Sequence, residues 1–290
     1  MNPNLVILAG GVSSRMKKET EAAADQDAGL FREAGEKPKS MLGVGPGGRP
    51  FLDFLIWNAR EAGYREIVIV IGEHDGGIRG RYGRAMRDNE FHGVRISYAI
   101  QRIAPGRSRP EGTADALRCA LRERADWAGT KFTVCNSDNL YSPNVLGRLL
   151  GTPHPGALID YDRDALGFDP SRIGQFAVIE KDQEGYLKAI IEKPSPADIE
   201  RVRDASGRVG VSMNIFRFTY DIVSGVLDEV PLHPVRQEKE LPAAVEMLVR
   251  GNPRAMSALP VSEYVPDLTG RGDIAIVRKY LRDNCPSDLW

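Results

Sequence analysis

Cysteine and histidine are scarce in this chain of 290 residues, which contains three cysteines and four histidines. Cys119, Cys135 and Cys285 are odd in number and far apart, so they favour neither a disulfide framework nor a CxxC metal or redox site. The histidines have no HExxH or HxxxH spacing, which argues against a histidine-built zinc site and a serine-type triad. We therefore expect chemistry based on carboxylates, lysine and arginine, in a reducing cytoplasm.

Long apolar runs and net charge are also missing. No stretch of about 18 apolar residues occurs, and Met1 leads through a short polar stretch into strand-like sequence instead of a signal peptide. We expect a protein that is neither secreted nor membrane-bound. The 39 Lys and Arg residues nearly balance the 40 Asp and Glu residues, with a formal charge of −1, so no global field attracts nucleic acid or an anionic membrane.

The chain does contain a regular alternation of short β-branched runs and amphipathic stretches. This rhythm predicts an α/β fold of Rossmann-like character: a mixed, mainly parallel sheet with helices on both faces. Ligands bind such sheets at the carboxyl ends of the strands. The predicted strands are residues 5–9, 67–71, 94–100 and 131–136, and the predicted helices are residues 51–63, 77–88 and 113–125.

The second half of the chain is richer in β-type sequence and predicts a smaller β subregion. Residues 175–193 have the pattern of a hairpin that turns at 183–185, and residues 209–218 have the pattern of a further strand. Later elements are predicted at residues 219–229, 238–250, 255–261 and from about 272. Residues 17–37 are polar and rich in alanine, so they cannot form core; a surface loop is the simpler interpretation and a lid over a site is the alternative.

Gly10 and Gly11 directly follow the first predicted strand, in LVILAGGVSSRM. Glycine lets backbone N–H groups approach phosphate oxygens without a Cβ in the way, and Arg15 adds a cation just beyond. A glycine pair after a strand is also an ordinary turn, and the pattern is neither a Walker A nor a GxGxxG motif. Lys39, in KPKSMLGV, precedes apolar and glycine-rich sequence, which indicates an ordered loop.

These segments resemble the signature of the sugar-1-phosphate nucleotidylyltransferases, also called NDP-sugar pyrophosphorylases. Further similarities follow in the family's order: Gln101 with EGTADAL, CNSDNLYS, Gly174 with IEKP, VSMNIFRF and PDLTGRGDI. The sequence departs from the family pattern in residues 16–38, which look like an insertion, and in the late segment, which lacks the usual W-x-D-x-G. Asn214 stands where many relatives have glycine.

The resemblance implies a set of site residues. The implied catalytic residues are Arg15, Lys39 and Asp138. The implied nucleotide-binding residues are Leu8, Ala9, Gly10, Gly11, Gln101, Gly112 and Thr113. The implied sugar-phosphate-binding residues are Gly174, Glu192, Lys193 and Asn214. The implied Mg²⁺ ligands are Asp138 and Asp267, with Asp273 as a rival for the second position.

The implied reaction is attack by a sugar 1-phosphate on the α-phosphorus of a nucleoside triphosphate, which releases pyrophosphate. A phosphate monoester has a second pKa of about 6, so it is largely dianionic at neutral pH and needs no general base. The site must position two polyanions and neutralise charge. Mg²⁺ suits this task because it binds one or two carboxylates together with substrate oxygens. Gln101 would make paired hydrogen bonds to a base edge, and Gly112 would leave room for that base.

Several of these residues also fit ordinary structural roles. Gly112 and Thr113 have the pattern of a helix start with Thr113 as the cap. Asp138 fits a turn ahead of the next helix. Glu192 and Lys193 fit an exposed ion pair at a strand end.

The expected organisation is one domain, residues 1–290, with a nucleotide-binding half (1–150), a sugar-phosphate-binding half (151–290) and no C-terminal β-helix. The expected partners are an NTP and a sugar 1-phosphate; the sequence leaves a homodimer, the base and the sugar open. Three rivals remain: a catalytically silent regulatory subunit that binds an NDP-sugar, a nucleotidylyltransferase for a non-sugar phosphate, and a glycosyltransferase, for which the sequence around Asp138 is a poor DxD motif.

Overall fold

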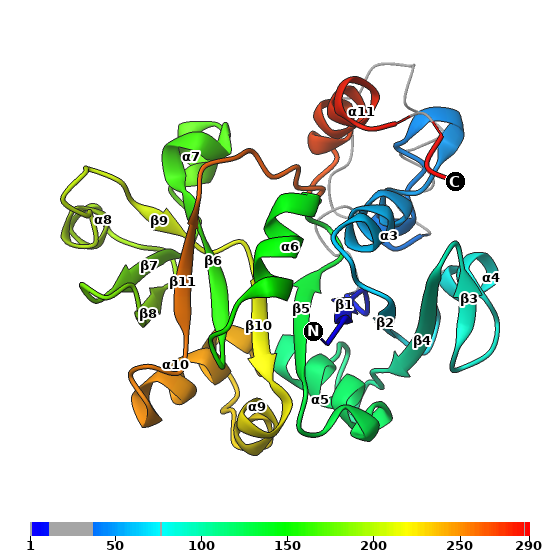
Figure 1. Ribbon diagram of the computed structural model, residues 1–290, viewed down its shortest axis with the longest axis horizontal. Helices are drawn as coiled ribbons and strands as arrows, with labels where there is room; N and C mark the ends of the chain where they lie inside the picture. Colours follow the sequence, from blue (N-terminus) through cyan, green and yellow to red (C-terminus); the bar gives the residue numbers. More distant parts are fainter. Residues whose placement is uncertain (1, 12–36, 76, 287) are drawn as a thin grey trace.

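A single sheet of eleven strands runs through the molecule (Figure 1). The structure, a computed structural model, describes residues 2–11, 37–75, 77–286 and 288–290. The strand order is β3-β4-β2-β1-β5-β10-β6-β9-β7-β8, and β11 pairs with β6. The mixed sheet with helices on both faces confirms the predicted fold class.

The parallel part of the sheet surrounds its first strand. The neighbouring parallel strands are β1 (Asn4–Leu8), β2 (Glu66–Ile71), β4 (Val94–Ile100) and β5 (Lys131–Asn136). The chain passes from β1 to β2 on one side and later returns to β5 on the other side of β1. This reversal of strand order is a topological switch point, and it opens a crevice beyond the carboxyl ends of β1 and β5.

Alternating side chains of the buried strands supply two apolar cores. Leu5 and Ile7 belong to one core and Val6 to the other, because successive strand residues point to opposite faces. The first core is covered by α3 (Phe51–Glu61), α6 (Pro143–Gly151) and α11 (Asp273–Asn284). The second is covered by α5 (Thr113–Glu123), α9 (Tyr220–Leu227) and α10 (Leu241–Gly251). Figure 1 shows the two helical layers on opposite sides of the sheet.

The second half of the chain extends the same sheet through β10 (Ile215–Thr219), which pairs antiparallel with β5. Beyond it lie β6 (Ala157–Asp162), β9 (Gly210–Val211), β7 (Val178–Lys181) and β8 (Leu187–Ile191), and β11 (Ser257–Val261) runs parallel to β6. The antiparallel pair β7–β8 confirms the predicted hairpin.

Two predicted elements are wrong in extent. The helix predicted over residues 77–88 is reduced to α4 (Ile78–Tyr82), because Gly83, with φ of 117°, ends it and the chain turns into β3 (Asn89–Phe91). The strand predicted over residues 209–218 is broken between β9 and β10, because Asn214 has φ of 55°, which a strand does not accommodate.

Several short elements complete the fold. The strands β3 and β6 and the helices α7 (Pro170–Ile173) and α8 (Pro196–Arg201) have no counterpart among the predicted elements. The 3₁₀ turns are η2 (Lys39–Met41), η3 (Pro46–Gly48), η4 (Ala125–Trp127) and η5 (Arg163–Leu166). Over the described residues, every helix is too short or too polar to cross a bilayer.

Candidate active site

A cavity of about 300 Å³ opens at the carboxyl ends of β1, β4 and β5. The residues predicted to bind the nucleotide all line it: Leu8, Ala9, Gly10, Gly11, Gln101, Gly112 and Thr113. Lys39 and Asp138 line the same cavity. Arg15 and most of the predicted insertion lie outside the described residues, so the role of Arg15 stays a prediction.

A loop segment of the second half, which contains Glu238 and Lys239, closes this cavity beside Gly112. Gly112 has φ of 107°, and a Cβ there would lie 2.5 Å from the carbonyl oxygen of Lys239. The N–H of Ala114 donates to the same carbonyl at 3.0 Å. Protein backbone therefore fills the place that a Cβ would take at Gly112, and the room for a base beside this glycine stays a prediction.

Thr113 also differs from its predicted structural role. It does not cap α5, whose N-cap is Gly112 without a side-chain hydrogen bond. Its hydroxyl oxygen instead accepts from the N–H of Leu241 at 2.8 Å, which ties the start of α5 to the start of α10.

The side-chain amide of Gln101 lies buried at the end of β4. Its Nε2 donates to the carbonyl oxygen of Gly112 at 2.9 Å and to Oδ2 of Asp115 at 2.8 Å. Both amide hydrogens are therefore engaged within the protein. In this arrangement only the amide oxygen is left to meet a base, as an acceptor, whereas the predicted paired hydrogen bonds use both groups of the amide.

Lys39 and Asp138 meet although 99 residues separate them. Lys39 lies in η2, and its Nζ donates to Oδ2 of Asp138 at 3.4 Å. Asp138 follows β5 and keeps 28% of its side chain exposed. The pair lies at the switch point. An anionic ligand there would contact the ammonium group of Lys39 and any metal ion bound by the carboxylate of Asp138.

The late segment brings Asp267 next to the turn after β5. Asn139 and Asp267 form an antiparallel bridge, and the N–H of Leu268 donates to the carbonyl of Asp138 at 2.8 Å. Burial, and then the charge of Asp138, raise the pKa of Asp267 above its usual range. Two adjacent carboxylates that repel each other at the edge of a cavity suit a divalent cation. The donor set is therefore chemically suited to Mg²⁺.

The rival Asp273 has a different environment. Its carboxylate accepts from the backbone N–H groups of Thr269 at 2.8 Å and Gly270 at 2.7 Å, at the start of α11. It also pairs with Arg172 and lines neither cavity described here. These contacts hold the loop that carries Asp267.

A second cavity, of about 480 Å³, adjoins the first and shares Asn136 and Asp138 with it. The predicted sugar-phosphate residues Glu192, Lys193 and Asn214 line it, as does Asp267. Lys193 has φ of 48°, an uncommon value for a lysine that marks a strained position at a candidate site. Gly174 is the exception among the predicted sugar-phosphate residues: it lies in the turn after α7, between lining residues, and does not itself line the cavity.

Sequence reasoning missed Arg172, which lines the second cavity. Its Nη2 donates to Oδ2 of Asp267 at 2.7 Å, and its guanidinium lies 4.7 Å from the centroid of the Phe168 ring. Burial opposes its charge, but Asp273 and Asp267 outweigh burial and raise the pKa of Arg172. Its only sequence signal is its place two residues before Gly174.

Two charged residues over the nucleotide cavity were also missed. Arg109 and Glu238 line it and form an ion pair at 3.2 Å. Glu238 belongs to the segment that closes the cavity beside Gly112, and its neighbour Arg236 lines the second cavity. The segment containing both residues therefore contacts both cavities.

The family model described as nucleotidyl transferase matches residues 34–257, well over half of the chain. This chain belongs to the nucleotidyl transferase family. The match begins after Gly11 and ends before Asp267, so the roles of those two positions rest on their motifs and their geometry.

Two curated relatives of this nucleotidyl transferase are 22% and 26% identical to it over the aligned residues. The low-salt glycan biosynthesis nucleotidyltransferase Agl11 of Haloferax volcanii is 26% identical over 190 residues, covering 65% of this chain and 44% of that protein. The bifunctional protein GlmU of Staphylococcus haemolyticus is 22% identical over 255 residues, covering 87% and 46%. The chain thus spans about half the length of these curated relatives.

A solved structure has the same fold. The UTP-bound UGPase from Acinetobacter baumannii superposes with a TM-score of 0.70 at 17% identity, covering 97% of this chain and 93% of that one. The predicted nucleotidyltransferase fold is confirmed.

Proposed function

We propose that this nucleotidyl transferase condenses a nucleoside triphosphate with a sugar 1-phosphate to form an NDP-sugar and pyrophosphate. The supporting observation is that the two cavities share Asn136 and Asp138. One cavity has a glycine-rich backbone rim suited to phosphates, and the other has Glu192 and Lys193 suited to a hydroxylated anion. Ligands in the two cavities would meet beside Asp138.

In this proposal the protein positions the reactants and neutralises their charge. A phosphate oxygen of the sugar phosphate bonds to the α-phosphorus while the bond to the bridging oxygen of the β-phosphate breaks, and pyrophosphate leaves. Lys39 pairs with the phosphates at the junction of the cavities, and Arg15 is proposed to clamp the outer phosphates. Lys193 pairs with the sugar phosphate, and Glu192 accepts hydrogen bonds from sugar hydroxyls. These interactions lower the barrier by orientation and electrostatic stabilisation.

We propose Asp138 and Asp267 as the ligands of Mg²⁺. When bound, this cation supplies charge neutralisation at the α-phosphate and the departing pyrophosphate. Over the described residues no group of three or more His, Cys, Asp and Glu residues could hold a metal, so these two carboxylates need substrate oxygens and water to complete the coordination. Arg172 restrains the orientation of Asp267 through its hydrogen bond.

A substrate panel tests the function. Purified protein with Mg²⁺ is incubated with each of the four common NTPs and a set of sugar 1-phosphates, and pyrophosphate release is measured. We expect release with at least one pair and none when either substrate is left out. Tight binding of an NDP-sugar without turnover on any pair would contradict the proposal and indicate the regulatory subunit instead.

A further inference from the structure

The amide of Gln101 is held in one orientation inside the nucleotide cavity. Gln101 is only 3% exposed. The two hydrogens of its Nε2 are donated to the carbonyl oxygen of Gly112 and to the carboxylate of Asp115. Neither partner can donate a hydrogen bond. Turning the amide over would therefore place its oxygen against two other oxygens, one of them charged.

Asp115 is itself fixed from its other side. It is 5% exposed and lies in the first turn of α5, where the helix dipole stabilises a carboxylate. Arg118 donates to its Oδ1, and the same guanidinium donates to Asp228 at 3.1 Å. The carboxylate that orients Gln101 is therefore held by a second partner and is not free to rotate away.

The oxygen of the Gln101 amide projects toward the glycine turn after β1. It would lie 3.3 Å from a Cβ built on Gly10, and Gln101 and Gly10 both line the nucleotide cavity. A nucleobase in that cavity would meet this residue as a hydrogen-bond acceptor only. A freely rotating amide offers a donor to one base and an acceptor to another, so it discriminates less than a fixed one.

We propose that Asp115 is a specificity-determining positioning residue, which locks Gln101 so that the nucleobase is recognised through an N–H donor on its hydrogen-bonding edge. The inference rests on the proposed nucleotidyl transfer and adds the selection of the base. Asp115 does not line the nucleotide cavity, and in this proposal it acts through Gln101. A base that presents only an acceptor at this point leaves the buried oxygen unpaired and is rejected.

The test is the ranking of nucleotides in the variant Asp115→Asn. An asparagine offers either an oxygen or an NH₂ group to Gln101, so the Gln101 amide can turn over. We expect the ratio of kcat/KM between the best and the second-best NTP to fall by about tenfold, with the KM for the sugar phosphate unchanged. A defect in folding would lower turnover of all NTPs together and leave that ratio as it was.

Asp228→Asn is the matched control. It removes the other carboxylate on Arg118 and leaves both hydrogen bonds of Gln101 in place, so we expect the wild-type ranking. An unchanged ratio in Asp115→Asn, or equal kcat/KM for all four NTPs in the wild type, would overturn the inference while leaving nucleotidyl transfer intact. Absence of turnover by the wild type with every pair would overturn both.

A second measurement needs no variant. The equilibrium Kd of the wild-type protein is measured for its best NTP and for an analogue of that NTP. In this analogue a methyl group replaces the hydrogen of the N–H on the hydrogen-bonding edge of the base. A matched analogue carries the methyl group on a ring carbon away from that edge. We expect the N-methyl analogue alone to bind about tenfold or more weakly; equal Kd values for the two analogues would overturn the proposal.

Discussion

Individual charges in this site have partners from distant parts of the sequence. Lys39 and Asp138 form one such pair across the mouth of the nucleotide cavity, at 3.4 Å. Asp138 also contacts the late segment through its own carbonyl group, which accepts from Leu268. A substitution at one of these residues therefore alters the charge balance that a polyphosphate would meet, while the surrounding backbone keeps its hydrogen bonds.

We expect Lys39→Ala and Asp138→Asn each to slow pyrophosphate release on the order of 10²-fold or more, because each removes a group that stabilises charge developing in the transition state. Initial rates at saturating substrates measure this, with thermal melting to verify folding. Lys188→Ala is the control, since Lys188 is an exposed lysine paired with Glu180, and neither residue lines either cavity. Wild-type rates in both site variants would refute their assignment.

The two late aspartates are expected to behave differently. Asp267→Asn removes a proposed cation ligand, so the Mg²⁺ concentration for half-maximal activity is expected to rise by about tenfold or more. Asp273→Asn weakens the contacts that hold the loop, so we expect a loss of about 1–2 kcal/mol in the free energy of unfolding and a smaller change in Mg²⁺ requirement. The opposite pattern would identify Asp273 as the ligand. Titration of activity with Mg²⁺ and urea unfolding provide the two measurements.

At the scale of elements, the starts of α5 and α10 are joined through Gly112. Gly112→Ala is expected to lower the free energy of unfolding by about 2–3 kcal/mol, because a Cβ would meet the Lys239 carbonyl and because φ is 107°. Gly129→Ala is a comparison at a positive φ without a close neighbour: its φ is 77° and nothing lies within 4 Å of its Cβ position, so about 1 kcal/mol is expected. Equal losses in urea unfolding would contradict a specific cost at Gly112 from the Lys239 contact and its backbone conformation.

Elements built from local patterns were predictable from the sequence, whereas those defined by distant partners were not. The strands β1, β2, β4 and β5 were found because each is a short run rich in β-branched and other apolar residues, which is typical of a strand in the middle of a sheet. The short strand β9 was merged with β10 because the break depends on the backbone of Asn214 alone. The helix expected after residue 77 was too long because Gly83 ends it.

The candidate site follows the same division. The positions of Gly10, Gln101 and Asp138 at one cavity were predictable because each lies one or two residues after a strand and belongs to a short motif. Arg172 and Glu238 were not, because their relevance arises from the folding of distant loops over the cavities. Asp115 lay inside a predicted motif, but nothing in the motif indicates that its carboxylate faces Gln101.

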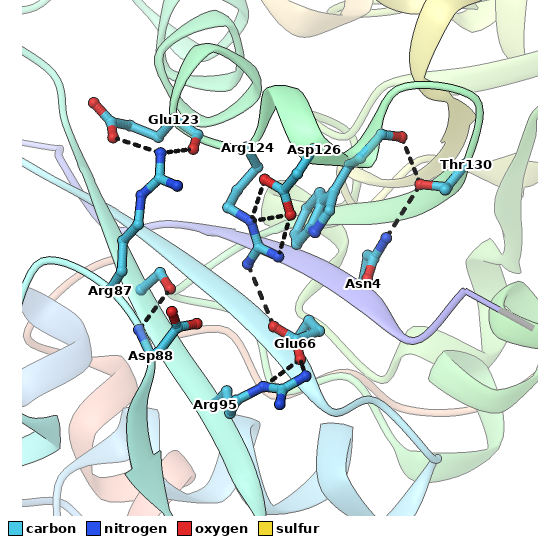
Figure 2. A network of polar contacts seen from close by, with 11 residues as sticks. Asn4, Glu66, Arg87, Asp88, Arg95, Glu123, Arg124, Asp126 and Thr130 are labelled. Atoms are coloured by element: carbon cyan, nitrogen blue, oxygen red, sulfur yellow. Dashed lines mark hydrogen bonds and ion pairs between the residues drawn. The ribbon is translucent and has the colours of Figure 1, made fainter.

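At the scale of the whole molecule, the two ends of the parallel strands carry different groups of residues. The site lies at the carboxyl ends, and a network of charges lies at the amino ends (Figure 2). Glu66, the first residue of β2, is 8% exposed and accepts from Nε of Arg95 at 2.6 Å and from Nη1 of Arg124 at 3.4 Å. Arg124 also binds Asp126 and lies 4.4 Å from the Trp127 ring centroid.

Stability and activity should therefore be separable. Glu66→Gln is expected to lower the free energy of unfolding by about 1–3 kcal/mol, because it removes a buried charge that two arginines contact. Its kcat/KM is expected to stay within about twofold of the wild type, since distant sites act independently. Glu184→Gln breaks an exposed pair with Arg254 and should cost less than about 1 kcal/mol. A large change in kcat/KM for Glu66→Gln would show that the two ends of the sheet are coupled.

The bridge between Asn139 and Asp267 has a consequence for synthesis on the ribosome. The polypeptide emerges in order, so the glycine turn, Gln101 and Asp138 all leave the exit tunnel long before the late loop does. A nascent chain at that stage has the cradle for a triphosphate but only one of its two proposed magnesium carboxylates. In the proposed mechanism the second carboxylate arrives last, when translation has passed residue 267 and the loop has docked.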